Sequence, residues 1–193
     1  MKKDEDILLG SKILNLIQPQ CKKNVLKDTP KRYIKALKEL TSYNTNKDDI
    51  DKYFVFFSSS SKNGLIIIKN IFFSSLCEHH ILPYFGYINI GYIPNGKILG
   101  LSKFRRIIDC FTKRLSIQEE LTYQIFDLFN TKLRPKALII TVEAKHTCSL
   151  VRGVKEQLLT IKTVKKSDYF NKNKGSQDEF FYAISSNHLQ LDK

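Results

Sequence analysis

The sequence lacks a hydrophobic run long enough to cross a membrane. No stretch of its 193 residues approaches the roughly 20 consecutive apolar residues that a membrane-spanning helix needs. The opening MKKDEDILLG carries acidic side chains and a short apolar patch, whereas a secretory signal needs a longer one. We therefore expect a cytoplasmic protein with no membrane partner.

Cysteine and histidine are scarce, with four of each. In the cytosol we expect thiols or metal ligands rather than disulfides. Two of the histidines are adjacent, in the segment SLCEHHILPYFG (75–86), which places Cys77, Glu78, His79 and His80 side by side. The cysteines are Cys21, Cys77, Cys110 and Cys148.

Arginine is also scarce, although the formal net charge is +13. The lysines are spread along the whole chain, which indicates a general compositional bias rather than a patch that neutralises phosphates. We therefore expect no nucleic-acid partner. The six arginines stand out against this background, at Arg32, Arg105, Arg106, Arg114, Arg134 and Arg152.

The chain is long enough for one domain with a helical appendage. We expect an N-terminal helical segment over 1–50 and a second region over 51–193. A first helix is predicted in DILLGSKILNLIQ. A second is predicted in KDTPKRYIKALKEL, with Asp28 or Thr29 as its cap and Pro30 in its first turn.

The second region alternates strands and helices. Its order predicts a strand pair, two helices and another strand pair, an α+β fold with the helices on one face of an antiparallel sheet. The predicted strands are YFVFF (53–57), GLIIIKNIFF (64–73), GYINIGYI (86–93), KILGL (97–101), KALIITVEA (136–144) and KEQLLTIKTV (155–164). The helices are SKFRRIIDCFTKRL (102–115), SIQEELTYQIFDLF (116–129) and a short closing one in DEFFYAI (178–184).

The spacing of thiols and imidazoles suggests a zinc site. Cys77 and His80 are three residues apart, so a tight turn can aim both at one point while His79 faces elsewhere. A catalytic zinc takes three protein ligands. Cys148 and His146, two apart at the end of a predicted strand, can supply the rest because alternate residues of a strand share a face. The alternative is a core thiol beside surface histidines.

Five segments resemble the GTP cyclohydrolase I family, in family order and with family-like spacing over residues 28–153. They are TPKRYIK (29–35), SLCEHHILPYFG (75–86), GYIPNGKILGLSKFRRI (91–107), RLSIQEELTYQI (114–125) and EAKHTCSLVRG (143–153). The resemblance implies Zn²⁺ bound by Cys77, His80 and Cys148. It implies a tunnelling fold, in which strands of several subunits close a barrel, and a homodecamer of two pentamers. The implied reaction converts GTP and water to formate and 7,8-dihydroneopterin triphosphate.

The resemblance also implies roles for single residues. His79 assists protonation at the purine ring nitrogen, and His146 serves later proton transfers. Ser102 is placed with the catalytic residues, at a plausible N-cap of the following helix. Lys103, Arg106 and Arg152 are expected to bind the GTP phosphates, together with Arg32 and Lys35 of a neighbouring subunit. The alternative is that these residues form a solvated basic face.

Gln118 and Glu119 correspond to the residues that recognise guanine. A carboxylate can accept two hydrogen bonds from guanine that adenine cannot donate. The competing interpretation is a capping box over Ser116–Glu119, in which Glu119 bonds a backbone amide.

The sequence after Gly153 departs from the family. It reads VKEQLLTIKTVKKSDYF where the family has a Ser/Thr-rich strand and a Leu-Gly-x-Phe element. This departure suggests a second hypothesis, a non-catalytic homologue that binds a pterin or a nucleotide.

Overall fold

The structure, a computed structural model, describes residues 2–20, 22–42, 50–60 and 64–186. The chain divides into two compact units, Met1–Ser42 and Tyr43–Lys193, which are described separately. Cys21 lies outside the described residues. None of the helices in the described part of the chain has the length and apolar character required to span a bilayer.

The first unit is a pair of helices, α1 (Lys2–Ile17) and α2 (Lys23–Leu40). They approach closely at Gly10, where an added Cβ would lie only 2.7 Å from the carbonyl oxygen of Pro30. Lys38 of α2 also bonds to Asp6 of α1. Glycine at the crossing therefore permits the close packing of the two backbones.

The predicted start of α2 is wrong. The helix begins at Lys23 rather than after Asp28 or Thr29, so Pro30 lies inside it. A proline in a helix interior costs about 3 kcal/mol because it removes a backbone donor and crowds the preceding turn. Pro30 is buried at the crossing with Gly10, and this packing offsets the cost.

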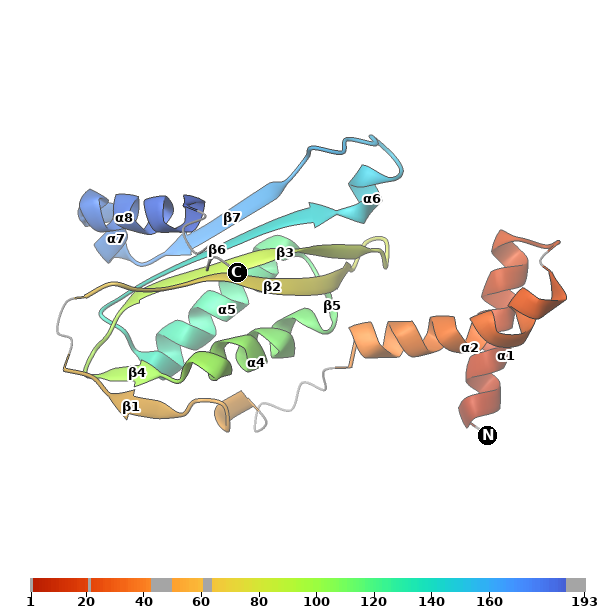
Figure 1. The fold of residues 1–193 in the computed structure, drawn as a ribbon, viewed down its shortest axis with the longest axis horizontal. Helices are drawn as coiled ribbons and strands as arrows, with labels where there is room; N and C mark the ends of the chain where they lie inside the picture. Colours follow the sequence, from red (N-terminus) through yellow and green to blue (C-terminus); the bar gives the residue numbers. More distant parts are fainter. Residues whose placement is uncertain (1, 21, 43–49, 61–63, 187–193) are drawn as a thin grey trace, which may run out of the picture. The chain divides into compact units, whose positions relative to one another are not determined.

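The second unit is built on a five-stranded sheet of order β5-β2-β3-β6-β7 (Figure 1). All neighbouring strands are antiparallel except the short β5, which runs parallel to β2. Two further strands form a separate antiparallel pair. The predicted α+β class is confirmed. The sheet strands are β2 (Ile66–Cys77), β3 (Pro83–Ile93), β5 (Leu115–Ser116), β6 (Ala137–His146) and β7 (Ile161–Lys166), and the separate pair is β1 (Phe56–Ser58) with β4 (Lys97–Leu99).

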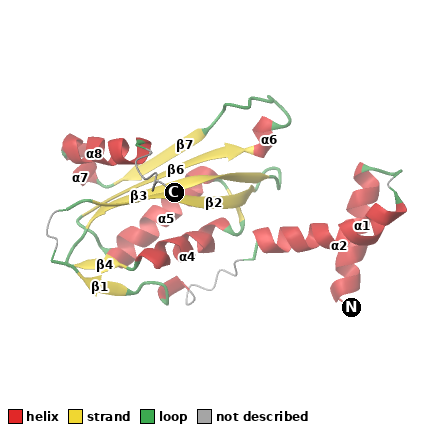
Figure 2. Cartoon of the chain, viewed as in Figure 1, coloured by secondary structure: helices red, strands yellow, loops and turns green. Residues whose placement is uncertain are grey.

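Helices α4 (Leu101–Thr112) and α5 (Gln118–Leu133) cover one face of this sheet, as predicted (Figures 1 and 2). Their buried apolar side chains meet those of β3 and β6 in the main core. Burial of each large apolar side chain contributes about 1.5–3 kcal/mol. The fully buried helix residues of this core include Ile107, Ile108, Leu121, Ile125 and Phe129.

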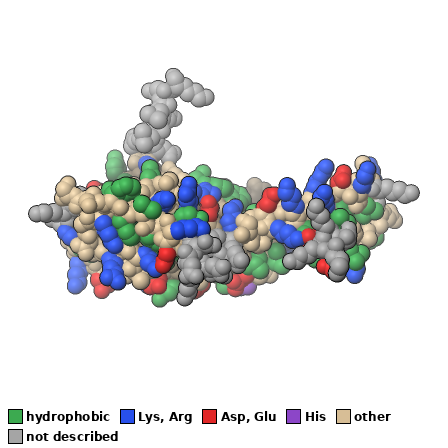
Figure 3. Space-filling view, turned by 90° about the horizontal axis from the view of Figure 1, so that it is seen from below, with side chains coloured by type: hydrophobic (Ala, Val, Ile, Leu, Met, Phe, Trp, Pro, Cys, Tyr) green, Lys and Arg blue, Asp and Glu red, His purple; other side chains and the backbone are tan. Residues whose placement is uncertain are grey.

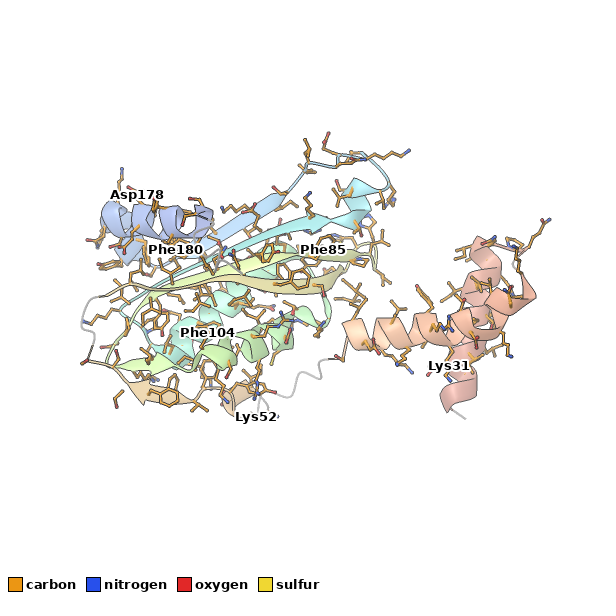
Figure 4. All side chains as sticks on the ribbon, in the orientation of Figure 1. Lys31, Lys52, Phe85, Phe104, Asp178 and Phe180 are labelled. Atoms are coloured by element: carbon orange, nitrogen blue, oxygen red, sulfur yellow. The ribbon has the colours of Figure 1, made fainter. Side chains whose placement is uncertain are left out.

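The opposite face of the sheet is also covered, which the sequence did not predict. Helices α7 (Asp168–Lys172) and α8 (Lys174–Ser185) lie there, and α8 includes the predicted closing helix. Figure 4 shows Phe104 and Phe180 on opposite sides of the sheet. At Gly91 an added Cβ would lie 2.6 Å from the Phe180 ring, so the missing side chain leaves room for it.

The last strand begins later than predicted. The pattern over 155–164 predicts a strand, but β7 starts at Ile161. Residues 151–160 form an exposed loop in which Gly153 and Lys155 adopt left-handed backbone conformations, with φ of 65° and 55°. These conformations cannot continue a strand, and the loop leaves Leu158 84% exposed.

Candidate metal centre and substrate pocket

The end of β2 curls into the turn that carries the adjacent histidines. The N–H of Cys77 donates to Leu82 O at 2.9 Å. The carbonyl oxygen of Cys77 accepts from the N–H groups of His80 at 3.3 Å and Ile81 at 2.8 Å. Ile81 has a φ of 54°, a left-handed conformation that β-branched residues rarely adopt. These bonds close residues 77–82 into a tight turn.

Both imidazoles of this turn approach the Cys77 thiol. Sγ of Cys77 lies 3.8 Å from Nδ1 of His80 and 4.0 Å from Nδ1 of His79. The prediction that His79 faces elsewhere is wrong, because the curl of the turn brings both rings round the same sulfur atom. The turn therefore offers one sulfur and two nitrogen donors of the kind that zinc prefers.

The second thiol arrives from the end of β6. His146 is the last residue of that strand, and Cys148 follows in a single helical turn, α6 (Thr147–Leu150). The extended geometry predicted for this pair therefore fails at Cys148. The two side chains still meet beside Cys77: a ring nitrogen of His146 and the two sulfur atoms all lie within 4.8 Å of one another. Cys77 and Cys148 are thiols and not a disulfide.

Two contacts hold the His146 ring: a hydrogen bond at Nε2 and a stacked aromatic ring on one face. Its Nε2 lies 2.9 Å from Oε1 of Gln118, and its ring stacks on Tyr84 with centroids 4.5 Å apart and planes at 8°. Gln118 is fully buried, and its amide nitrogen donates to Val142 O and Ile161 O, each at 3.0 Å. The amide that the resemblance assigns to guanine is thus engaged within the chain.

Beneath the site lies a buried hydroxyl network that sequence reasoning missed. Tyr84 Oη lies 2.6 Å from Ser116 Oγ, which lies 2.9 Å from Ser75 Oγ. Ser75 Oγ donates to Arg114 O at 2.8 Å. All three hydroxyl residues are buried. Their only signal in the sequence is that they stand inside the family-like segments, since serine and tyrosine in a strand are otherwise typical of an exposed face.

A cavity of about 270 Å³ opens in front of the two thiols. It brings together the predicted metal ligands, His79, His146 and the predicted guanine-recognising pair. Leu159 and Ile161, from the segment that departs from the family, form part of its wall. The lining residues are Cys77, His79, His80, Ser116, Ile117, Gln118, Glu119, Ala144, His146, Cys148, Ser149, Leu159 and Ile161.

The capping box proposed for the start of α5 does not form. The N-cap is Ile117, and it makes no side-chain cap hydrogen bond. Ser116 lies in β5 with its hydroxyl bonded to Tyr84 and Ser75. The carboxylate of Glu119 is exposed in the first turn of α5 and lines the cavity, so it is available to a ligand.

Burial shifts the pKa values of three groups at the site. It lowers the pKa of His146 below the usual range, and the Glu119 carboxylate acts in the opposite direction. Burial raises the pKa of the Cys148 thiol, and the neighbouring Cys77 adds to the rise. Burial also raises the pKa of Tyr84, whereas the hydrogen bond with Ser116 lowers it by a smaller amount. A neutral His146 imidazole keeps a lone pair for a proton or a metal ion.

The predicted phosphate ligands do not line this cavity. Helix α4 begins beside β4, at the end of the sheet away from the 77–82 turn (Figure 1). Lys103 lies in the first turn of that helix, Arg106 lies halfway along it, and Arg152 is exposed in the loop after α6. Figure 3 shows Lys and Arg spread over the visible face rather than gathered in one patch.

Three further predicted residues are not among those that line this cavity. Arg32 and Lys35 belong to the first unit and stand 3.9 Å from Asp28 and 3.6 Å from Glu39. Ser102 is the second residue of α4, whose N-cap is Gly100, so the prediction that Ser102 caps this helix is wrong.

The chain is similar to known proteins along most of its length. The family model described as GTP cyclohydrolase I matches residues 9–185. The chain is 42% identical over 160 residues to GTP cyclohydrolase 1 of Coxiella burnetii strain RSA 493, covering 82% of this chain and 86% of the relative. It is 39% identical over 177 residues to that of Methylococcus capsulatus, covering 91% and 95%.

A relative of similar length is GTP cyclohydrolase 1 of Campylobacter jejuni serotype O:6, 39% identical over 186 residues and 96% of both chains. Among solved structures, the apo form of the archaeosine synthase QueF-Like matches with a TM-score of 0.44 and 20% identity. That match covers 56% of this chain and 95% of the other.

Proposed function

Since this chain belongs to the GTP cyclohydrolase I family, we propose that it converts GTP and water to formate and 7,8-dihydroneopterin triphosphate, the first step of folate and pterin biosynthesis, in the cytoplasm. The observation that carries the proposal is the convergence of two thiols and three imidazoles on one small cavity. Such a donor set suits metal-assisted hydrolysis.

The proposed cofactor is Zn²⁺, with Cys77, His80 and Cys148 as its protein ligands. The donor set fits this ion, because thiolate and imidazole are its usual protein ligands. His146 is the rival third ligand, since its ring nitrogen lies within 4.8 Å of both sulfur atoms. When bound, zinc supplies a nucleophile at neutral pH by lowering the pKa of a water molecule.

The remaining imidazoles are proposed as proton carriers. His79 is exposed at the rim of the cavity, where it can assist protonation at the purine ring nitrogen. His146 is proposed to serve later proton transfers at the ribose and the ring. Imidazole suits both steps because its pKa lies near neutral pH.

Glu119 is proposed to recognise guanine. Its carboxylate lines the cavity and is not used as a helix cap. Two hydrogen bonds from guanine to this carboxylate would exclude adenine, which lacks the donors. Gln118 lies beside it in the same wall.

The triphosphate is proposed to bind residues of neighbouring subunits. The cavity of one chain, about 270 Å³, lies just below the roughly 300–1,000 Å³ typical of ligand pockets. Lys103, Arg106 and Arg152 lie outside its walls, and Arg32 and Lys35 belong to the first unit. In a tunnelling-fold decamer of two pentamers, as the family implies, a neighbour can bring Ser102 and these basic groups to the cavity.

The proposal is tested by incubating the purified zinc-loaded protein with GTP and measuring formate and pterin fluorescence. We expect both products in equal amounts, and loss of both after treatment with a chelator. A protein that binds GTP but releases no formate when loaded with zinc would instead be the non-catalytic homologue.

A further inference from the structure

The side chain of Gln118 has only one possible orientation. Its amide nitrogen lies 3.0 Å from the carbonyl oxygens of both Val142 and Ile161, on β6 and β7. Exchanging the amide nitrogen and oxygen would set Oε1 against two carbonyl oxygens, with no hydrogen atom between them. The packing of Gln118 under the two strands therefore fixes which atom faces His146.

This orientation determines the tautomer of His146. Oε1 of Gln118 lies 2.9 Å from His146 Nε2, and an amide oxygen can only accept. Nε2 of His146 must therefore carry the hydrogen atom. In the neutral ring the single remaining lone pair is then on Nδ1.

The plane of the same ring is fixed by Tyr84. The two rings are nearly parallel with centroids 4.5 Å apart. Tyr84 cannot turn away easily, because its hydroxyl is bonded to Ser116, which is bonded in turn to Ser75. His146 is thus constrained in tautomer by Gln118 and in orientation by Tyr84.

We propose that Gln118 is a positioning residue that acts through His146 and does not itself recognise guanine. It holds His146 with a hydrogen atom on Nε2, so that Nδ1 is the ring nitrogen left to accept a proton or a metal ion. The catalytic consequence rests on the proposed function, whereas the assignment of the tautomer does not.

The tautomer can be measured directly. The chain has only four histidines, so ¹⁵N labelling of histidine gives a simple magnetic-resonance spectrum, and His146→Asn identifies the His146 signals. We expect a protonated Nε2 and an unprotonated Nδ1 in the metal-free wild type. A neutral His146 ring that carries its hydrogen on Nδ1 would overturn the proposal, whether or not any variant folds.

Gln118→Met and Thr163→Val form a matched pair for the same measurement. Methionine keeps the volume of Gln118 but cannot accept the hydrogen bond, so we expect His146 to lose its single tautomer. Thr163 lies 3.3 Å from the same amide nitrogen, and valine there leaves the Gln118–His146 bond in place, so we expect the wild-type signals. Unchanged His146 signals in Gln118→Met would contradict the proposal.

Kinetics distinguish positioning from guanine recognition. In Gln118→Met we expect kcat for GTP to fall about 10- to 100-fold, the usual cost of losing a partner of an active-site histidine, with KM within about twofold. A raised KM with an unchanged kcat would show guanine recognition and refute the positioning role. If the wild type itself fails to turn over GTP, the proposed function fails and the spectrum still tests the tautomer.

Discussion

At the scale of single residues, three imidazoles lie close to the Cys77 thiol, and one of them, His146, also lies close to Cys148. His79 and His80 reach Cys77 from the turn after β2, and His146 reaches it from the end of β6. Tetrahedral zinc with two thiolates has room for two of these rings at most. The choice among them decides which ring holds the metal and which is left to move protons.

His80→Ala should lose stoichiometric zinc, whereas His79→Ala should keep zinc and lose turnover. The reason is that a metal site needs all its ligands, while a proton carrier contributes only to the reaction. Zinc content measured by atomic absorption on purified variants checks this, with Cys110→Ser as the control for a thiol away from the site. Zinc lost in His146→Ala but retained in His80→Ala would exchange the assigned roles of His80 and His146.

Glu119→Gln should weaken GTP binding about 10- to 100-fold, because a hydrogen bond to a charged group contributes about 1.5–3 kcal/mol. Glu120→Gln is the matched control, since Glu120 is also exposed in the first turn of α5 and accepts from Gln124 at 2.9 Å. Equilibrium binding of GTP and ATP measures the effect. Equal affinities of the Glu119 variant and the control for GTP would rule out recognition by Glu119.

The sequence predicted these residues better than it predicted their contacts. Cys77, His80 and Cys148 came from spacing and family resemblance, and the structure brings them into one cavity. The bonds of Gln118 and Tyr84 could not be predicted, because they join segments that are distant in the sequence and depend on the register of β6 against β3 and β7.

At the scale of elements, the turn over 77–82 combines function with backbone strain. Ile81 is exposed, so burial of its side chain contributes little to stability, and its positive φ is unfavourable for a β-branched residue. Left-handed conformations of residues other than glycine cost about 1–3 kcal/mol. The strain is the consequence of closing the chain tightly enough to place two imidazoles beside Cys77.

Ile81→Asn should therefore stabilise the protein. Asparagine tolerates the left-handed region, so we expect a gain of about 1 kcal/mol and a rise in Tm of about 2–4 °C. Zinc content should stay at the wild-type level because the turn keeps its shape. Thermal unfolding of the metal-free protein is the measurement, and Ile81→Val, which keeps the β-branch, is the control; equal Tm values for the two variants would show that the turn is not strained.

Local signals located the elements but not all of their ends. In KDTPKRYIK the proline, preceded by Asp28 and Thr29, predicts a helix start. Helix α2 nevertheless begins seven residues before Pro30, because packing of Pro30 against Gly10 favours a longer helix. The capping box at Ser116 fails for a similar reason, since its hydroxyl is bonded to Tyr84 and Ser75 beneath the sheet. In both places a contact between distant segments outweighs a local preference.

At the scale of the whole molecule, the proposed metal ligands line one cavity, whereas Lys103, Arg106 and Arg152, which are proposed to bind the phosphates, do not line it. The cavity lies at the 77–82 turn, and Arg106, the sixth of the twelve residues of α4, is not among its lining residues. If these residues form one site, that site contains residues of two chains, which the interfaces of a symmetric oligomer allow.

Mixed oligomers test this arrangement. Cys148→Ala and Arg106→Ala should each be inactive alone, but co-expressed chains should regain activity in about a quarter of their sites by random mixing. The recovered sites pair an intact Cys148 of one subunit with an intact Arg106 of its neighbour. Formate release by the co-purified mixture is the measurement. Absence of any recovery would place both residues in one chain's site.

The sheet separates two hydrophobic clusters of unequal size. The larger lies under α4 and α5, and the smaller contains Ile93, Ile139, Phe170 and Phe180 under α7 and α8. Because the small cluster shares no helix with the large one, we expect α8 to open as a cooperative unit of its own. Amide hydrogens of α8 should exchange with deuterium faster than those of α5.

Gly91→Ala should accelerate exchange in α8, because the new Cβ would press on the Phe180 ring, while leaving the α5 amides nearly unchanged. Equal acceleration in both helices would show a single cooperative unit. Independent opening would let α7 and α8 leave the sheet on their own timescale, while the thiols and imidazoles at the ends of β2 and β6 keep their positions.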